Sequence, residues 1–305
     1  MRKRWGFITN DKTRYHAFLL IASIFFNAGV LTPAFSNDAD DKSFQDYDYQ
    51  EAKYDVYAGG IRVVQAEMVM DFRDEEHYSL VFKAQVSGFL GALVPWEGTF
   101  ETHGWALPGL ERIRLPEQHI STASWRGEEE IKTYRYDRNK GFQDLTTLYI
   151  GKKPRKEKPE EELTKGTTDV ISASLMVMEH VSDGKPCEGV DEVFDGKRRY
   201  KLIFHHKGYV HLKKTRYNVY EGSAVECMVE VEPVAGAWYS KPRGWLSIQE
   251  QGRSLGTMPT IWMAQITENA VVMPVRMRVK TAYGTLFMHM TEYKSGDTVL
   301  SIKDN

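Results

Sequence analysis

The alternation of apolar and polar residues predicts a protein built mainly of β-strands. The clearest stretch covers residues 77–87, where Tyr78, Leu80, Phe82, Ala84 and Val86 occupy every second position. Because successive side chains of a strand point to opposite faces, this spacing buries one face. Similar stretches recur at 53–57, 61–72, 96–104, 110–115, 119–125, 130–136, 223–231, 245–250, 261–267, 271–281 and 285–293. The pattern predicts a long curved antiparallel sheet or an incomplete β-barrel.

A single stretch, residues 169–181, follows a helical pattern. Thr167, Thr168 and Asp169 offer oxygens that can accept hydrogen bonds from the first turn, and Gly184 is a suitable end. Apolar residues cover most of the surface of this helix, so we expect it to pack against the concave side of the sheet. Its methionines suit either ordinary core packing or an adaptable ligand pocket.

Three segments lack a regular pattern. Residues 88–96 are apolar and interrupted by glycine, which is typical of a loop over the end of the sheet or of a mobile apolar lip at a ligand cavity. Residues 151–165 combine a run of bases, a run of acids and two prolines, and they predict a mobile charged loop. We expect one domain over residues 47–295, with a loop at 233–244 and a C-terminal tail at 296–305.

The first 36 residues are typical of a secretory signal peptide. A basic start precedes an apolar run of about 15 residues, shorter than the ~20 that span a bilayer. Ala34 and Ser36 supply small residues at a cleavage site between Ser36 and Asn37. An uncleaved membrane anchor is the alternative. The sequence therefore predicts export to the periplasm, a flexible leader at 37–46 and a mature chain without a transmembrane segment.

The overall charge disfavours nucleic acid as a partner. The full chain has 40 bases and 42 acids, and the first 36 residues account for five of the bases and one of the acids. The remaining chain therefore has a net charge of −6. Proteins that bind nucleic acids through their phosphates are normally basic, so a general nucleic-acid binder is not expected.

The chain has two cysteines, Cys187 and Cys227. In an exported protein a pair of cysteines is expected to form a structural disulfide. The alternative is a reactive thiol, but no Cys-x-x-Cys motif supports it.

The most basic part of the chain lies between the two cysteines. Residues 197–216 contain eight Lys or Arg residues and no Asp or Glu, interleaved with aromatic and branched side chains. After an Asp195-Gly196 turn, this pattern predicts two half-buried strands. The candidate anion-binding residues are Lys197, Arg198, Arg199, Lys213, Lys214 and Arg216. They form either a solvated outer face or a surface for lipid, lipopolysaccharide or acidic envelope glycan. In the last predicted hairpin, Arg276, Arg278 and Lys280 share one face, which we expect to be hydrated.

The sequence contains no recognisable catalytic motif. We find no nucleophile elbow, no His-Glu-x-x-His and no glycine-rich phosphate loop. His205, His206 and His211 resemble metal ligands only at first sight, because adjacent strand residues face opposite ways. We therefore predict no catalytic residues, no metal site and no cofactor.

Four segments together resemble a known family. They are residues 54–61, residues 169–173, the stretch 193–200 that follows Cys187, and residues 233–236 that follow Cys227. They are similar to the exported domain-of-unknown-function family numbered 3108, although Val170 stands where the family more often has proline. The resemblance covers most of residues 50–295. It implies a β-rich fold and residence in the periplasm of a Gram-negative bacterium, and it implies no reaction.

The sequence thus favours a non-enzymatic periplasmic protein that binds a ligand or maintains the cell envelope. An apolar or amphiphilic ligand would lie in the concavity of the sheet. The alternatives are a hydrolase of envelope glycan or lipid, which needs a cleft with converging carboxylates or histidines, and a purely structural interaction module.

Overall fold

The computed structural model describes residues 48–107, 113–241, 245–281 and 284–302. The predicted signal peptide, its cleavage site at Ser36 and Asn37 and most of the predicted leader lie outside these residues. Within them the protein is mainly β-structure, as predicted, with one large sheet and a few helices. No helix in this part of the chain is long and apolar enough to cross a membrane.

The N-terminal half of the sheet is a meander in which each strand pairs with the next. Its strands are β1 (Tyr49–Ala58), β2 (Ile61–Asp71), β3 (His77–Val86), β4 (Trp96–Leu107), β5 (Ile113–Trp125), β6 (Glu128–Asp137), β7 (Gly141–Tyr149) and β8 (Arg155–Glu157). In β3, the alternating residues Tyr78, Leu80, Phe82 and Ala84 are buried, which confirms the predicted face. The tight β1–β2 turn uses Gly59 and Gly60, both with positive φ.

The C-terminal half adds seven more strands to the same sheet. They are β9 (Gly189–Phe194), β10 (Arg198–Leu212), β11 (Gly222–Gly236), β12 (Thr260–Ala264), β13 (Met273–Thr281), β14 (Gly284–Ser295) and β15 (Thr298–Ser301). Strand β14 pairs antiparallel with β1 and joins the two halves, while β15 branches from β14. Strands β8 and β9 lie at the two ends of the strand order and do not pair with each other, so the sheet is an incomplete barrel.

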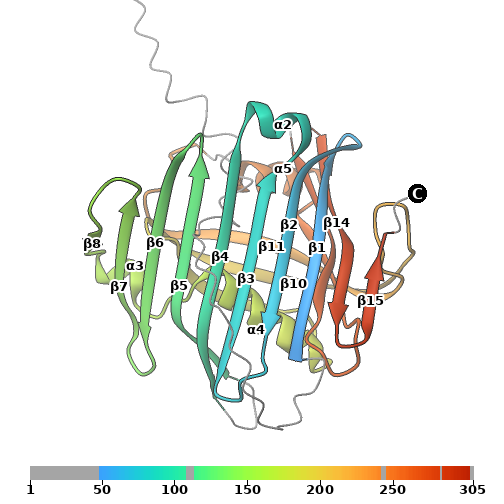
Figure 1. The fold of residues 1–305 in the computed structure, drawn as a ribbon, viewed down its shortest axis with the longest axis horizontal. Coiled ribbons are helices and arrows are strands. Elements are labelled where there is room, and N and C mark those ends of the chain that lie inside the picture. The colour runs from blue at the N-terminus through green and yellow to red at the C-terminus, as the bar shows by residue number, and fades with distance from the viewer. Residues whose placement is uncertain (1–47, 108–112, 242–244, 282–283, 303–305) are drawn as a thin grey trace, which may run out of the picture.

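The sheet curls around helix α4 (Val170–Ser182). Figure 1 shows β10 and β11 passing behind β3 to β5, with α4 on the concave side. The helix buries Ile171, Ala173, Leu175, Val177, Met178 and Val181. These side chains share one core with the inner faces of both halves of the sheet. The prediction of one apolar helix packed in a curved sheet is therefore confirmed.

A second, smaller core brings β9 close to β6 and β7. Phe194, at the end of β9, packs with Tyr134, Tyr136 and Leu145. Gly196 follows in the β9–β10 turn, where its φ is +91° and an added Cβ would lie 2.8 Å from the Tyr134 hydroxyl. Only glycine fits this turn without displacing its neighbour. The two ends of the sheet therefore approach through side chains rather than through strand pairing.

The prediction of two strands within residues 197–216 is wrong. The structure has a single 15-residue strand there, β10, which pairs with β9 on one side and β11 on the other. Gly208 does not turn the chain but lies at a register shift between β10 and β11. Lys213, Lys214 and Arg216 lie beyond the end of this strand.

Several shorter segments also differ from the prediction. Residues 245–250 begin helix α5 (Trp245–Leu255) rather than a strand, because a short apolar run fits either period. Residues 88–93 form the short helix α2 (Gly88–Leu93), and the charged loop 151–165 contains β8 and helix α3 (Glu161–Thr164). Strand β11 extends to Gly236, into the predicted loop, and β15 forms within the predicted C-terminal tail.

Candidate functional site

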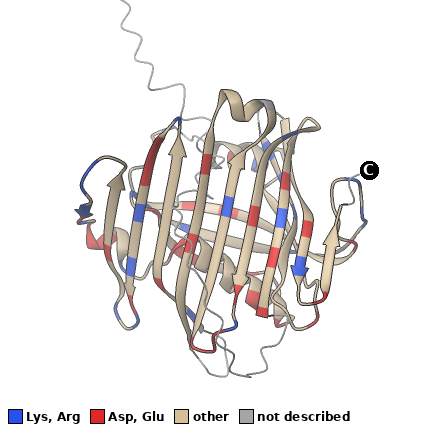
Figure 2. Ribbon diagram, viewed as in Figure 1, with Lys and Arg blue, Asp and Glu red and all other residues tan. Residues whose placement is uncertain are grey.

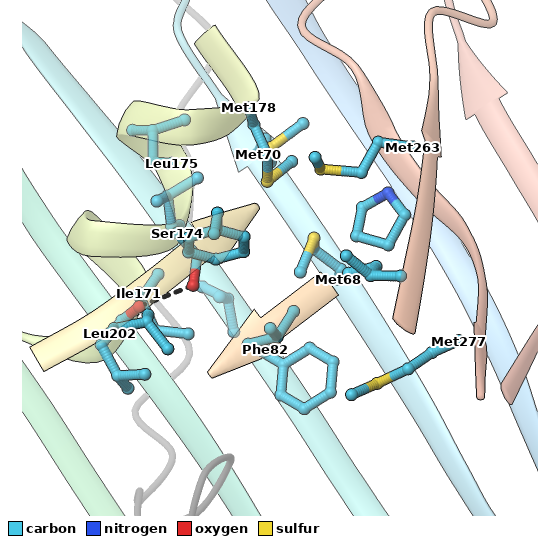
Figure 3. Close-up of a pocket in the computed structure, with 17 residues that line it drawn as sticks. Met68, Met70, Phe82, Ile171, Ser174, Leu175, Met178, Leu202, Met263 and Met277 are labelled. Atoms are coloured by element: carbon cyan, nitrogen blue, oxygen red, sulfur yellow. Dashed lines mark hydrogen bonds between the residues drawn. The ribbon is translucent and has the colours of Figure 1, made fainter. Parts of the chain in front are cut away.

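An apolar cavity lies between α4 and the concave face of the sheet (Figure 3). Its seventeen lining residues come from α4, β2, β3, β10, β11, β12 and β13. Five of them are methionines: Met68, Met70, Met178, Met263 and Met277. Because these five come from four different elements, the cavity exists only where the curled sheet and the helix meet.

The lining of the cavity is almost entirely apolar. Ser174 supplies the only polar side chain among the described lining residues. Its hydroxyl donates a hydrogen bond to the carbonyl of Val170 at 2.8 Å, one turn earlier in α4 (Figure 3). Among the described lining residues, none is ionisable and the single hydroxyl already donates its proton within α4, so the lining offers no general acid or base.

The cavity is small, with a volume of about 80 Å³. An apolar cavity of about 150 Å³ holds a molecule as large as benzene. Several lining residues, including Met68, Val170, Ser174 and Ile261, are only half-buried, so the cavity lies close to the surface at these positions. Methionine side chains have three rotatable bonds and repack easily, so this lining can widen by rotation of its side chains.

Helix α4 is anchored to the sheet by a buried polar network at its N-terminus. Asp169 accepts hydrogen bonds from the backbone N–H groups of Ile171 and Ser172, as predicted for the first residue of the helix. It also accepts from the hydroxyls of Ser172 at 2.6 Å and Thr102 at 3.0 Å. The network thus fixes the start of the helix to β4.

This network contains aspartate, histidine and serine but is not arranged as a catalytic triad. The hydroxyl of Ser172 bonds to the carboxylate of Asp169, whereas in a triad it would bond to the imidazole. His119 Nδ1 lies 2.8 Å from the Thr102 hydroxyl, and its ring packs against Phe100 and Tyr134. All members of the network are buried, and burial lowers the pKa of His119. The arrangement therefore positions α4.

A second buried contact holds the other end of the helix. Arg114 Nε donates to the carboxylate of Glu179 at 2.9 Å, and the guanidinium lies over the rings of Phe72 and Tyr78. Both charged side chains are largely shielded from solvent, a situation in which removing one partner is costly. The sequence did not predict this pair, because Arg114 and Glu179 are 65 positions apart. It did not predict the Thr102–His119 contact either, because these residues lie on different strands and Thr102 is 67 positions from Asp169.

Cys187 and Cys227 form a disulfide, as predicted. Cys187 lies between α4 and β9, and Cys227 lies on β11, with both side chains fully buried. The bond joins the segment after the helix to the sheet that surrounds it.

The six candidate anion-binding residues do not form one surface. Three of them (Lys197, Arg198 and Arg199) lie at the start of β10, and the other three lie after its end. A strand of this length separates the two groups by about 45 Å. Arg198 pairs with Asp195 at 2.6 Å, and Arg199 pairs with Glu192. Arg216 donates to the Tyr217 hydroxyl at 2.6 Å.

Acidic residues on the neighbouring strand pair with further side chains of β10. Lys201 pairs with Glu232, and His205 pairs with Glu230, both from β11. Figure 2 shows both signs of charge interspersed across the strands of the sheet. This arrangement supports the solvated outer face over a single anionic-surface site.

The histidines of β10 are separated as the strand geometry requires. His205 bonds to Glu230, whereas the ring of His206 contacts that of Tyr209. No group of three or more His, Cys, Asp or Glu residues placed to hold a metal ion occurs in the described ranges.

The short helix α2 packs against β2 and β3 at one end of the sheet (Figure 1). None of the described lining residues of the cavity belongs to residues 88–96. The described lining therefore favours the interpretation of this segment as a cover over the end of the sheet.

Comparisons with known proteins place the chain in a family. No curated protein matches it. A crystal structure titled as a beta-barrel-like protein of domain of unknown function DUF1849, from Brucella abortus, has a TM-score of 0.41 and 10% identity, covering 83% of this chain and 99% of that one. A likeness at that level carries no argument about function. The family model described as "Protein of unknown function (DUF3108)" matches residues 53–291. The chain therefore belongs to the DUF3108 family.

Proposed function

We propose that this protein is a non-enzymatic binding protein of the periplasm that holds the hydrocarbon part of an apolar or amphiphilic ligand. The observation that carries the proposal is the methionine-lined cavity between α4 and the concave face of the sheet. Among its described lining residues no side chain is charged and the single hydroxyl donates its proton to Val170, so the cavity suits a hydrocarbon chain rather than a charged headgroup.

Two features of the site support binding over ordinary core packing. Protein cores are normally filled to crystal density, whereas this one leaves a cavity of about 80 Å³. The five methionines can rotate away from an entering chain without opening the strand pairing around them. In this proposal a ligand enters beside half-buried lining residues such as Met68, Val170, Ser174 and Ile261.

The periplasmic location rests on residues 1–36 and their predicted cleavage before Asn37. Intact-mass analysis of the protein from a periplasmic extract is expected to show a chain that begins at or near Asn37. A full-length chain in the membrane fraction would contradict the location while leaving the cavity proposal open to its own test.

The cavity is tested by filling it and by enlarging it. Ser174→Leu places a larger apolar side chain into the space, whereas Ser174→Ala removes the hydroxyl without filling it and is the matched control. Met277→Ala enlarges the cavity. Binding of a fluorescent fatty acid such as cis-parinaric acid is expected to fall about tenfold or more in Ser174→Leu and to persist in Ser174→Ala.

Mass spectrometry of lipids that co-purify with the native protein provides the second measurement. We expect a hydrocarbon-bearing ligand that is retained by Ser174→Ala and Met277→Ala but lost from Ser174→Leu. Equal probe binding by all variants, or no binding by any, would show that the cavity is a packing defect and would overturn the proposal. Melting temperatures of the variants show whether the fold is retained.

A further inference from the structure

A group of arginine and aromatic side chains lies on the convex face of β12, β13 and β14. Arg276 and Arg278 alternate along β13 with Met277, which lines the cavity on the opposite face. The group is therefore separate from the proposed apolar site. The sequence predicts a hydrated face here, but both arginines are half-buried in the structure.

Aromatic rings hold the two arginines in place. The guanidinium of Arg276 lies 5.0 Å from the ring centre of Trp262 and 5.3 Å from that of Phe287. The guanidinium of Arg278 lies 5.5 Å from the same Trp262 ring, and its Nη2 donates to the Thr260 hydroxyl at 3.2 Å. Ring faces stabilise a cation but leave most of its in-plane N–H donors without acceptors.

These arginines differ from the other half-buried arginines in the described part of the chain. Arg114 pairs with Glu179, Arg198 with Asp195 and Arg199 with Glu192. Within the described part of the chain, no carboxylate forms an ion pair with Arg276 or Arg278. The buried Nε atoms of both arginines also have no hydrogen-bond partner there. Such groups are costly to bury unless a ligand or solvent completes them.

Nearby groups compensate the two positive charges only in part. Burial, and then the charge of Arg278, lowers the pKa of Arg276, and the nearby carboxylate of Glu226 opposes this shift without reversing it. Burial and the charge of Arg276 lower the pKa of His289 to about 4, so this histidine is neutral near pH 7. The carboxylate of Glu226 accepts a hydrogen bond from Trp262 Nε1 at 3.2 Å instead of pairing with either arginine.

We infer that Arg276 and Arg278 form a binding site for a phosphate group on the convex face of the sheet. The two guanidiniums are two residues apart on one face of a strand, about 6–7 Å between their Cα atoms, so both can reach one tetrahedral anion. A phosphate monoester carries a charge of about −1.5 to −2, which matches two arginines, whereas a carboxylate would leave one uncompensated.

The rim of the site extends toward the segment that follows β10. The rings of Phe287, His289 and Tyr217 stack in a row, with centres 6.0 Å apart at each step. The guanidinium of Arg216 lies over the ring of Tyr217, 4.6 Å from its centre. This row borders the phosphate site, and Arg216 adds a further positive charge at its edge.

Phosphate binding is tested with the double variant Arg276→Gln/Arg278→Gln. The matched control is Lys83→Gln/Arg135→Gln, which removes the same charge from exposed residues of β3 and β6. Calorimetric titration with inorganic phosphate is expected to show binding by the native protein and the control, weakened at high salt. The double variant is expected to lose about tenfold or more in affinity, because charge-assisted hydrogen bonds are lost.

Phosphatidylcholine vesicles with and without phosphatidic acid distinguish the source of the phosphate. Binding only to vesicles that contain phosphatidic acid assigns the site to a lipid headgroup, and binding of inorganic phosphate alone assigns it to a soluble phosphate. Arg276→Lys/Arg278→Lys keeps the charge and the fold but loses the forked donors, so it is expected to bind more weakly than the native protein. Equal affinities of native protein and Gln variant, or no binding of either probe, would overturn the inference.

Discussion

The two faces of β13 differ in the kind of side chain that they present and in how those side chains are packed. On the concave face, Val275 and Val279 are buried in the main core and Met277 borders the apolar cavity. On the convex face, Arg276 and Arg278 lie among aromatic rings with buried donor atoms that have no partner among the described residues. The same nine-residue strand therefore contributes to packing on one side and, on the other, presents two arginines that form no ion pair with a described carboxylate.

This contrast shows which side of the sheet stabilises the fold and which side is available for recognition. Removing a contact on the concave face leaves a cavity or a buried polar group without a hydrogen-bond partner. Either change lowers the free energy of unfolding. Removing an arginine from the convex face relieves repulsion between like charges. The two faces should therefore respond to substitution with effects of very different size.

The largest effect is expected at the buried network that fixes α4 inside the curl. Asp169→Ala removes the acceptor for two backbone N–H groups and two hydroxyls. Loss of the helix cap and of buried acceptors is expected to lower the free energy of unfolding by about 3–5 kcal/mol, measured by urea denaturation. Asp183→Ala, at the exposed end of the same helix, should change it by less than about 0.5 kcal/mol. Similar losses in both variants would mean that the network does not anchor the helix.

The disulfide is the second strongest support of the concave side. Replacing Cys187 and Cys227 by serine removes a bond that closes a segment of 40 residues. The expected loss of unfolding free energy is about 2–4 kcal/mol, since native strand pairing already restricts this segment. When the unsubstituted protein is denatured without a reducing agent, thiol titration should find no free thiol. Two titratable thiols would refute the bond in the native protein.

Acid should lower the free energy of unfolding through one histidine on each face of the sheet, His119 and His289. Burial lowers the pKa of His119 on the concave side, and the pKa of His289 on the convex side falls to about 4. In the unfolded chain both titrate near 6.5, so between about pH 6.5 and 4 the unfolded state binds more protons. The part of the unfolding free energy that depends on these two neutral histidines is therefore fully present above pH 6.5. It decreases as the pH falls toward 4.

The variant His289→Gln separates the contribution of the convex face. Its unfolding free energy should fall less steeply than that of the native protein over this pH range. Carboxylates with lowered pKa values, such as Asp71 and Glu230, affect both proteins alike at the acid end. Identical slopes for the two proteins would show that His289 is not held neutral.

The sequence predicted the features that depend on local spacing. The alternation in β3 and the cap of α4 at Asp169 both follow from neighbouring residues. The single strand β10 was missed because the pattern of residues 197–216 does not show that they form one strand; its continuous pairing with β11, with a register shift at Gly208, becomes apparent only in the structure. Helix α5 was missed because its apolar residues fit period two; the buried amide of Gln249, which pairs with both backbone groups of Val231, becomes apparent only in three dimensions.

The two candidate sites depend on contacts that no local pattern reveals. The methionines of the cavity are up to 209 positions apart, between Met68 and Met277, and meet only because the sheet curls. The alternation of Arg276 and Arg278 is visible in the sequence. The absence of an acid beside them depends on the register of β12 and β14, which places Trp262, His289 and Phe287 at those positions.

The smallest effect on stability is expected at Arg276 and Arg278 on the convex face. The direction of the change in melting temperature distinguishes a binding role from a structural one. Without phosphate, Arg276→Gln/Arg278→Gln should melt at the same temperature as the native protein or slightly above it, because repulsion between two partly desolvated charges is removed. Added phosphate should raise the melting temperature of the native protein and not that of the variant. A purely structural role of the two arginines, through their contacts with Trp262 and Phe287, predicts the opposite: a lower melting temperature in the variant and no response to phosphate in either protein.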